Sequence, residues 1–357
     1  MNPNRKIRVL VVDDSAVVRK MISEALSFDP EIEVVGTACD PFVAREKILE
    51  LNPDVMTLDI EMPRMDGLTF LRILQQHRPM PVVIISSLTQ AGSRAALDAM
   101  EFGAVDVLAK PKSAWNLGDL RDQLARRVKA AVSARLNHVR PKSQAAPVGT
   151  NDHYAPQQII VIGASTGGTE AIKEVLMRLP DGLPGILIVQ HIPPLFSKTF
   201  AERLNELCAM EVHEAKSGDE VRLGMALVAP GDFHMTVEWE KNSYRVHLNQ
   251  HPPIHYTRPA VDMLFNSAAR CAGPNAVGVL LTGMGRDGAQ GMQQLKAAGG
   301  TNIVQNEETC VVYGMPRAAV EIGAADKVLP LDHIPHAILH ALGARASSRT
   351  ETTPVLK

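Results

Sequence analysis

The segment QIIVIGASTGG, residues 158–168, sets the architecture of the C-terminal half of this 357-residue chain. Its first part, Ile159–Ile162, is a run of four β-branched apolar residues, which is typical of a fully buried strand. A glycine-rich turn follows at Gly163–Gly168, and an apolar helical pattern begins at Thr169. A buried strand that passes through a tight turn into a helix is the repeating unit of a parallel α/β sheet. We therefore predict an α/β domain around this segment.

The turn also carries a candidate nucleophile. It has the spacing G-x-S-x-G, with Ser165 at its centre. Between a strand and a helix, this spacing exposes a serine hydroxyl, and the free amides at the helix N-terminus favour developing negative charge. The same turn could instead bind a phosphate or simply connect two elements, and the motif alone does not choose between these interpretations.

A serine nucleophile needs a general base and a group that orients the base. The buried run Ile186–Gln190 ends directly in His191, and a second run, Val277–Leu281, leads into a glycine-rich segment that contains Asp287. If these strands neighbour each other in a parallel sheet, their carboxyl ends share one edge and the side chains converge. The sequence thus predicts a triad of Ser165, His191 and Asp287. Its order along the chain, Ser–His–Asp, differs from the Ser–Asp/Glu–His order of α/β-hydrolases.

The other polar residues of this half have plainer interpretations. Turn signals and a short apolar period over 210–248 predict short antiparallel strands, and polar contacts explain the histidines there: His213, His234 and His247. His251 and His255 have the spacing of a helical metal pair, but the two prolines between them forbid a regular helix. Arg258 and Asp262 fit either a local ion pair or contacts with a substrate.

The N-terminal half repeats the strand–helix pattern five times. This spacing predicts a parallel sheet with helices on both faces. The expected strands are Ile7–Val12, Ile32–Ala38, Val55–Leu58, Val82–Ile85 and Val105–Leu108. The expected helices are Ser15–Ser27, Pro41–Leu51, Leu68–His77, Ser93–Phe102 and Leu117–Arg135.

Polar residues end four of these strands: Asp13 and Asp14 the first, Asp59 the third, Ser86 the fourth and Lys110 the fifth. Three clustered carboxylates repel one another, and a hard cation such as Mg²⁺ compensates them. Asp59 can then attack a phosphoryl donor, while Lys110 neutralises the developing charge and Ser86 hydrogen-bonds the new phosphoryl group. Each residue alone also fits an ordinary role, such as a helix cap, but their agreement at one sheet edge favours a phosphorylation site.

Composition and spacing limit the class of protein. The net charge of −2 argues against a nucleic-acid-binding protein, and no helix-turn-helix pattern is present. Four scattered cysteines indicate neither a zinc site nor a disulfide framework. Neither a signal peptide nor a membrane-spanning run is visible, so we expect a soluble, cytoplasmic protein without membrane insertion. The expected division is a first domain at 1–127, a proline-containing linker at 128–157, a catalytic domain at 158–345 and a flexible tail at 346–357.

The first domain resembles the response-regulator receiver family. The motifs that carry the resemblance are Val11–Ser15, Leu58–Gly67, Ser86-Ser87 and Ala109–Pro111. The resemblance implies a flavodoxin-like fold, Asp59 as phosphoacceptor, and Asp13 and Asp14 as the acidic pocket. It also implies that the side chains of Asp14 and Asp59 and the carbonyl of Glu61 bind Mg²⁺, and that the Lys110–Pro111 bond is cis. Val107 departs from the family, because many receivers carry an aromatic residue there.

The second domain resembles the chemotaxis protein-glutamate methylesterase domain of the CheB family. Gly163–Gly168, Gln190-His191 and Leu281–Gly288 carry the resemblance. It implies hydrolysis of glutamate methyl esters on methyl-accepting chemotaxis receptors, with release of methanol, and in many members deamidation of receptor glutamines. Carried over, Ser165 is the nucleophile, His191 the general base and acid, and Asp287 the orienting residue. Thr166 and the Met284 amide become oxyanion candidates.

The resemblance also fixes expectations about cofactors, partners and control. It implies no metal or cofactor for the esterase reaction. The expected phosphodonor is a chemotaxis sensor histidine kinase, and the receiver is expected to inhibit until Asp59 is phosphorylated. A hydrolase of small-molecule esters would share the same triad, so the residues leave that alternative open. An assay on free esters against methylated receptor separates the two.

Overall fold

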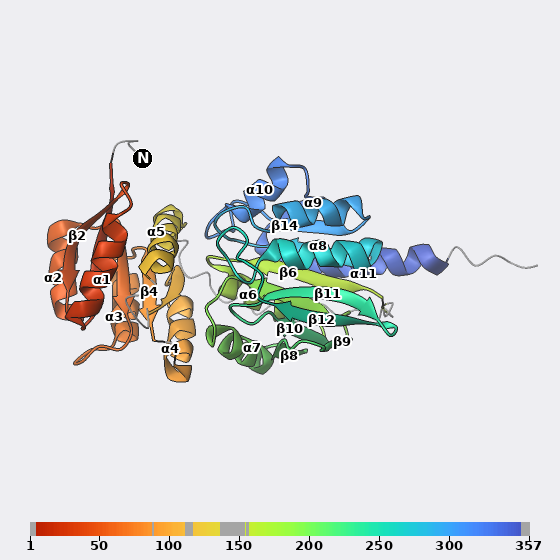
Figure 1. Ribbon diagram of the computed structural model, residues 1–357, viewed down its shortest axis with the longest axis horizontal. Coiled ribbons are helices and arrows are strands. Elements are labelled where there is room, and N and C mark those ends of the chain that lie inside the picture. The colour runs from red at the N-terminus through yellow and green to blue at the C-terminus, as the bar shows by residue number, and fades with distance from the viewer. Residues whose placement is uncertain (1–4, 88, 111–116, 136–153, 155–156, 351–357) are drawn as a thin grey trace, which may run out of the picture. The chain divides into compact units, whose positions relative to one another are not determined.

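The computed structural model describes residues 5–87, 89–110, 117–135, 154 and 157–350. The chain forms two compact units, Met1–Pro141 and Lys142–Lys357 (Figure 1). Each unit is built on a parallel sheet, as the strand–helix alternation of the sequence predicts. Among the described helices, none is long and apolar enough to cross a membrane.

The first unit contains a five-stranded parallel sheet in the order β2-β1-β3-β4-β5. Its strands are β1 (Ile7–Val12), β2 (Ile32–Ala38), β3 (Val55–Asp59), β4 (Val82–Ser86) and β5 (Asp106–Ala109). Its helices are α1 (Ala16–Ser27), α2 (Pro41–Leu51), α3 (Gly67–His77), α4 (Gln90–Glu101) and α5 (Leu117–Ser133). The chain leaves β1 for β2 on one side and returns to β3 on the other, which opens a crevice at the carboxyl ends of β1 and β3.

Side-chain caps fix where α1, α2, α3 and α4 begin. Ser15 accepts a hydrogen bond from the Val18 amide at the start of α1. Asp40, Asp66 and Thr89 cap α2, α3 and α4 in the same way. Each cap satisfies an amide that would otherwise lack a partner in the first turn, so the turn after each strand is held firmly.

The second unit contains a seven-stranded parallel sheet in the order β15-β14-β13-β6-β7-β10-β8, and a separate antiparallel sheet, β11-β12-β9. The parallel strands are β6 (Ile159–Ala164), β7 (Ile186–Gln190), β8 (Glu211–Glu214), β10 (Met225–Val228), β13 (Ala276–Leu280), β14 (Thr301–Gln305) and β15 (Lys327–Leu329). The antiparallel strands are β9 (Glu220–Val221), β11 (His234–Glu240) and β12 (Ser243–Asn249).

Helices pack around this sheet in two groups. In one group α8 packs against α9 and α9 against α10 (Figure 1). In the other, α6 packs against both α7 and α11. The helices are α6 (Gly168–Leu176), α7 (Phe196–Leu207), α8 (Val261–Cys271), α9 (Ala289–Ala297), α10 (Met315–Glu321) and α11 (Ile334–Thr350). Every residue of β6, β7 and β13 is buried, so the central strands have both faces covered.

The prediction of antiparallel strands over 210–248 is wrong for two of the strands. β8 and β10 pair in parallel and extend the main sheet, whereas β9, β11 and β12 are antiparallel as expected. β8 lies at the sheet edge and has mixed exposure, which resembles the alternation of an antiparallel strand. The pattern of a four-residue strand reports its burial and carries no information about the direction of its partner.

Two expected domain limits fall inside helices. α5 continues to Ser133, and Val128 is buried, so a linker that begins at residue 128 would interrupt that helix. α11 continues to Thr350, beyond the expected domain end at 345. Most of the expected linker, and residues 351–357 of the expected tail, lie outside the described residues.

Candidate active site

The three candidate triad residues follow three adjacent strands. β6 pairs with β7 on one side and with β13 on the other, and Gly163 is in register with both Val189 and Leu280. The loops that follow are joined by backbone hydrogen bonds. The His191 amide donates to the Ala164 carbonyl (3.1 Å), and the Ser165 amide donates to the Thr282 carbonyl (3.0 Å). Parallel pairing therefore brings the three loops to the same edge of the sheet.

His191 and Asp287 form a buried hydrogen-bonded pair. The distance from His191 Nε2 to Asp287 Oδ2 is 2.8 Å, and both side chains are almost fully buried. Since Nε2 is turned to the carboxylate, Nδ1 is the ring nitrogen that can accept a proton from a serine. Ser165 is 9% exposed, and no hydrogen bond between its hydroxyl and the His191 ring is recorded in this part of the structure. Such a contact commonly tightens only when substrate binds.

Contacts with His191 and with two backbone amides favour the ionised form of Asp287. Its carboxylate accepts hydrogen bonds from the Val261 amide (2.7 Å) and the Asp262 amide (2.9 Å), both in the first turn of α8. Burial alone would raise the pKa of Asp287. The hydrogen bond and charge of His191, together with the α8 amides, outweigh burial and hold that pKa below 3.8.

Glycines and one glutamine shape the turn that carries Ser165. Gly167 has a φ of 76°, a left-handed conformation that favours glycine, and it begins α6 without a side-chain cap. A Cβ at Gly168 would lie 2.1 Å from Gln190 Oε1 and 2.6 Å from Ala164 Cβ, which cannot rotate away, so only glycine fits there. Gln190 is buried, and its side-chain nitrogen donates to the Ser165 carbonyl (2.8 Å). Sequence reasoning used Gln190 only as part of the Gln190-His191 motif and assigned it no role in the turn, although a polar residue at the end of a buried apolar strand was a signal.

The oxyanion candidates lie on either side of Ser165. Thr166 is buried, and its carbonyl accepts a hydrogen bond from the Thr282 hydroxyl (3.0 Å). Met284 follows Gly283, where an added Cβ would lie 2.7 Å from Ser165 Cβ. The backbone at Gly283, next to Met284, thus passes directly beside the serine, and the role of the Met284 amide stays a prediction.

Arg258 and Asp262 do not pair with each other. Arg258 binds the Asp232 carboxylate, at 2.6 Å, and also donates to the carbonyls of Gln250 and His251. Asp262 instead lies 3.4 Å from His255 Nε2. His255 has a φ of 50°, so the loop holds no helix that could bring it and His251 together as a metal pair.

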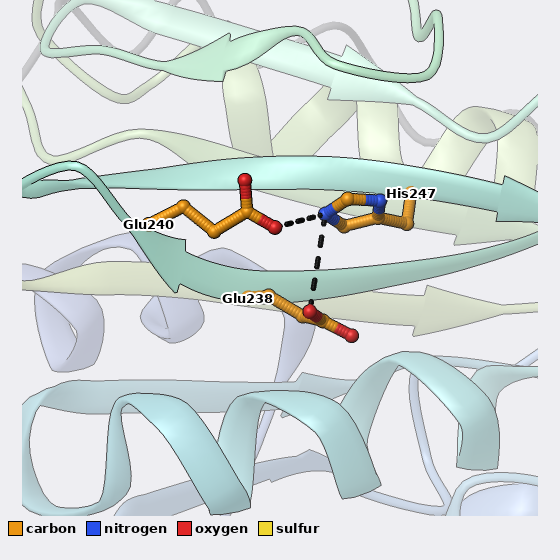
Figure 2. A group of neighbouring side chains, drawn as sticks. All are labelled: Glu238, Glu240 and His247. Atoms are coloured by element: carbon orange, nitrogen blue, oxygen red, sulfur yellow. Dashed lines mark hydrogen bonds and ion pairs between the residues drawn. The ribbon is translucent and has the colours of Figure 1, made fainter.

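His213, His234 and His247 make polar contacts, as expected. His247 on β12 lies 2.9 Å from Glu240 and 4.0 Å from Glu238, both on β11, as Figure 2 shows. His213 lies 2.6 Å from Glu211. His234 is buried between the Ala260 amide and the Pro252 carbonyl, and burial lowers its pKa.

In the first unit, all five predicted residues lie at the same sheet edge, and the carboxylates and the lysine among them are in close contact. Lys110 Nζ lies 2.7 Å from Asp59 Oδ2 and 3.0 Å from Asp13 Oδ2. Asp14 is exposed beside them, and carboxylate oxygens of Asp13, Asp14 and Asp59 lie within 4.8 Å of one another. Burial raises the pKa of Asp59 to about 6, although Lys110 opposes the shift.

This acidic pocket fits a hard cation. Carboxylate oxygens of Asp13, Asp14 and Asp59 converge here, and the single Lys110 ammonium, which contacts Asp13 Oδ2 and Asp59 Oδ2, offsets only part of their charge. Carboxylate oxygens of this kind are the ligands that Mg²⁺ prefers. The Glu61 amide donates to Asp59 Oδ1 (3.2 Å), which fixes Glu61 next to the pocket.

The Ser86 hydroxyl already has a hydrogen-bond partner. This buried hydroxyl donates to the Gly92 carbonyl (3.2 Å) in the first turn of α4, and the Ser86 carbonyl accepts from the Lys110 amide (2.8 Å). Val107 is buried, where many receivers have an aromatic side chain. Pro111 lies outside the described residues, so the predicted cis bond stays a prediction. Sequence reasoning missed Arg64, which pairs with the Asp40 cap of α2.

Known proteins share both units. The family model for the response regulator receiver domain matches residues 9–121, and the model for CheB methylesterase matches residues 160–338. A protein-glutamate methylesterase/protein-glutamine glutaminase 2 of Syntrophus aciditrophicus is 53% identical over 92% of this chain and 97% of its own length. A protein of the same name from Pseudomonas aeruginosa is 50% identical over 96% of this chain and 98% of its own length.

A solved structure agrees with these matches. The crystal structure of the Thermotoga maritima CheB methylesterase catalytic domain is 41% identical, with a TM-score of 0.50, and covers 51% of this chain and 97% of that domain. The CheB family model spans half of the chain, and relatives matched over almost their full length share about half of its residues. The chain therefore belongs to the CheB methylesterase family and carries a response regulator receiver domain in front of the catalytic domain.

Proposed function

We propose that the chain is a phosphorylation-regulated serine hydrolase that demethylates glutamate methyl esters on methyl-accepting chemotaxis receptors, and that it deamidates receptor glutamines. The observation that carries the proposal is the buried His191–Asp287 pair at the same sheet edge as Ser165. The names of the full-length relatives give the substrate class, and the receiver supplies the control. We place this activity in the cytoplasm, where a phosphodonor kinase is available.

The geometry supports the following reaction. Ser165 Oγ attacks the ester carbonyl while His191 Nδ1 accepts its proton, and Asp287 stabilises the imidazolium that forms. Backbone amides beside the serine, with Thr166 and Met284 as candidates, bind the oxyanion. His191 then gives the proton to the methoxy oxygen of the ester, which leaves as methanol. In the second half, His191 accepts a proton from the water that attacks the acyl-enzyme and returns it to Ser165 Oγ. With a glutamine substrate the leaving group is ammonia.

The receiver is phosphorylated in a reaction that depends on Mg²⁺, as its family implies. We propose that Asp59 accepts the phosphoryl group from a chemotaxis sensor histidine kinase. The side chains of Asp14 and Asp59 and the carbonyl of Glu61 would hold the ion, which neutralises charge on the phosphoryl oxygens. Lys110, already in contact with Asp59, supplies the second cation.

Loss of the nucleophile should abolish hydrolysis. Ser165→Ala should reduce methanol release from methylated receptor membranes by about 10³-fold or more, and His191→Ala and Asp287→Asn should also cause severe losses, because a triad acts as a unit. Ser243→Ala, at the first residue of β12, is the matched control and should keep full activity. Undiminished turnover in Ser165→Ala refutes the assignment. Equal turnover of free methyl esters and receptor would favour a small-ester hydrolase.

Activity should fall at acidic pH. The pKa of Asp287 is held below its ordinary value, so this carboxylate stays ionised while the solution is acidified through the range where histidines gain protons. A protonated His191 cannot accept the serine proton, and log(kcat/KM) should decline by about one unit for each unit of pH. A pH–rate profile without this acid limb would rule out His191 as the base.

Phosphorylation should depend on one aspartate. Acetyl phosphate with Mg²⁺ should label the full-length protein, and Asp59→Asn or chelation of the metal should abolish the label. Asp122→Asn, an exposed carboxylate on α5, serves as the control and should be labelled like the wild type. Labelling that survives both Asp59→Asn and chelation contradicts the acidic-pocket proposal.

We expect the receiver to restrain the catalytic unit until it is phosphorylated. A chain that begins at about residue 150 should therefore hydrolyse receptor methyl esters several-fold faster than the unphosphorylated full-length protein. Phosphorylation should bring the full-length rate toward that of the shorter chain, because a ligand shifts an equilibrium by its differential affinity for the two states. If the shorter chain is no faster, phosphorylation acts by stimulation or recruitment instead.

A further inference from the structure

Helices α8 and α9 begin next to each other, and neither is capped by its own preceding residue. Ala260 before α8 and Gly288 before α9 make no side-chain cap hydrogen bond. Instead, a carboxylate near the start of each helix accepts hydrogen bonds from first-turn amides of the other helix. Asp287, just before α9, accepts from the first-turn amides of α8, and Asp262 Oδ1 of α8 accepts from the Gly291 amide in the first turn of α9 (2.7 Å).

The two helix starts are in close contact. A Cβ at Gly291 would lie 2.6 Å from Phe265 Cβ, and a Cβ at Gly288 would lie 2.7 Å from Val261 Cγ1. Figure 1 shows α8 and α9 side by side. Because the glycines leave no space between the helices, a shift of the α9 start relative to α8 would move the loop that carries Asp287.

Asp262 is an unusual residue for this place. It is 4% exposed, and burial together with the adjacent charge of Asp287 raises its pKa. A buried carboxylate beside another carboxylate costs stability unless it is well paired. Its partners are the Gly291 amide and the His255 ring, which lies 3.4 Å away. The triad mechanism itself assigns no step to Asp262.

We propose that Asp262 is a positioning residue of the hydrolase, an inference that rests on the proposed function. By accepting from the Gly291 amide, it locks the first turn of α9 onto α8 and so fixes the position of Asp287. Asp287 Oδ2 must meet both His191 Nε2 and the Val261 amide, and a displacement of its loop would break this geometry. Asp262 acts through Asp287 and does not contact the reacting atoms.

The test compares Asp262→Ala with Asp262→Asn in the full-length protein. Asp262→Ala should lower kcat for methanol release by about 10- to 100-fold, with KM within about twofold, because misplacing a catalytic group slows the chemical step. Asp262→Asn keeps an oxygen that can accept from Gly291 and should stay within about threefold of the wild type. Asp326→Ala is the matched control. Asp326 also holds α9, through Lys296 in its last turn, but at the end remote from Asp287.

Thermal unfolding of all variants separates positioning from stability. Asp326→Ala should lower the unfolding temperature without changing kcat. If Asp262→Ala also lowers the unfolding temperature without changing kcat, the proposal is wrong. It is also wrong if Asp262→Asn loses as much kcat as Asp262→Ala. Labelling of Ser165 by an alkyl fluorophosphonate gives a readout that does not depend on the receptor. A wild type that reacts with this probe but releases no methanol refutes the proposed substrate alone, and slower labelling of Asp262→Ala would still support the positioning role.

Discussion

The pairing of β6 with β7 on one side and β13 on the other is the constraint on which the catalytic unit depends. Parallel strands end at the same edge, so this pairing alone brings the loops of Ser165, His191 and Asp287 together. The receiver uses the same solution, because β1 lies between β2 and β3 and places Asp13 beside Asp59. In both units the chemistry lies where the order of strands reverses.

Two buried aspartates have pKa values that are shifted in opposite directions, although burial by itself raises both. Asp287 receives two helix amides and the His191 ring, and its pKa is lowered. Asp59 receives one amide and the Lys110 ammonium but has Asp13 beside it, and burial raises its pKa to about 6. The number of donors decides which effect prevails. A firmly ionised carboxylate suits an orienting role, whereas a carboxylate short of positive charge suits a pocket that recruits a cation.

Sequence reasoning located elements well where the local pattern carries the information. The strand ends that hold Ser165, His191, Asp59 and Lys110 follow from apolar runs that stop at polar residues. It failed where partners are distant in sequence. The direction of β8 and β10 depends on the strand each one pairs with. The hydrogen bonds from the Asp262 amide to Asp287 and from the Gly291 amide to Asp262 join residues 25 and 29 positions apart. No local hydrophobic period indicates contacts of that separation.

The receiver already contains a bond that phosphorylation can exchange. Ser86 donates to the Gly92 carbonyl, which ties the end of β4 to the first turn of α4, and Lys110 is divided between Asp59 and Asp13. A phosphoryl group on Asp59 offers a stronger acceptor to both Ser86 and Lys110. If the Ser86 hydroxyl turns to the phosphoryl group, its hydrogen bond to the first turn of α4 is lost. Val107 is a buried aliphatic residue, so no aromatic ring at that position can move together with Ser86. We therefore expect the start of α4 to be the element through which this receiver reports its phosphorylation, and the difference in free energy between the old and new contacts of Ser86 and Lys110 limits how far the equilibrium can move.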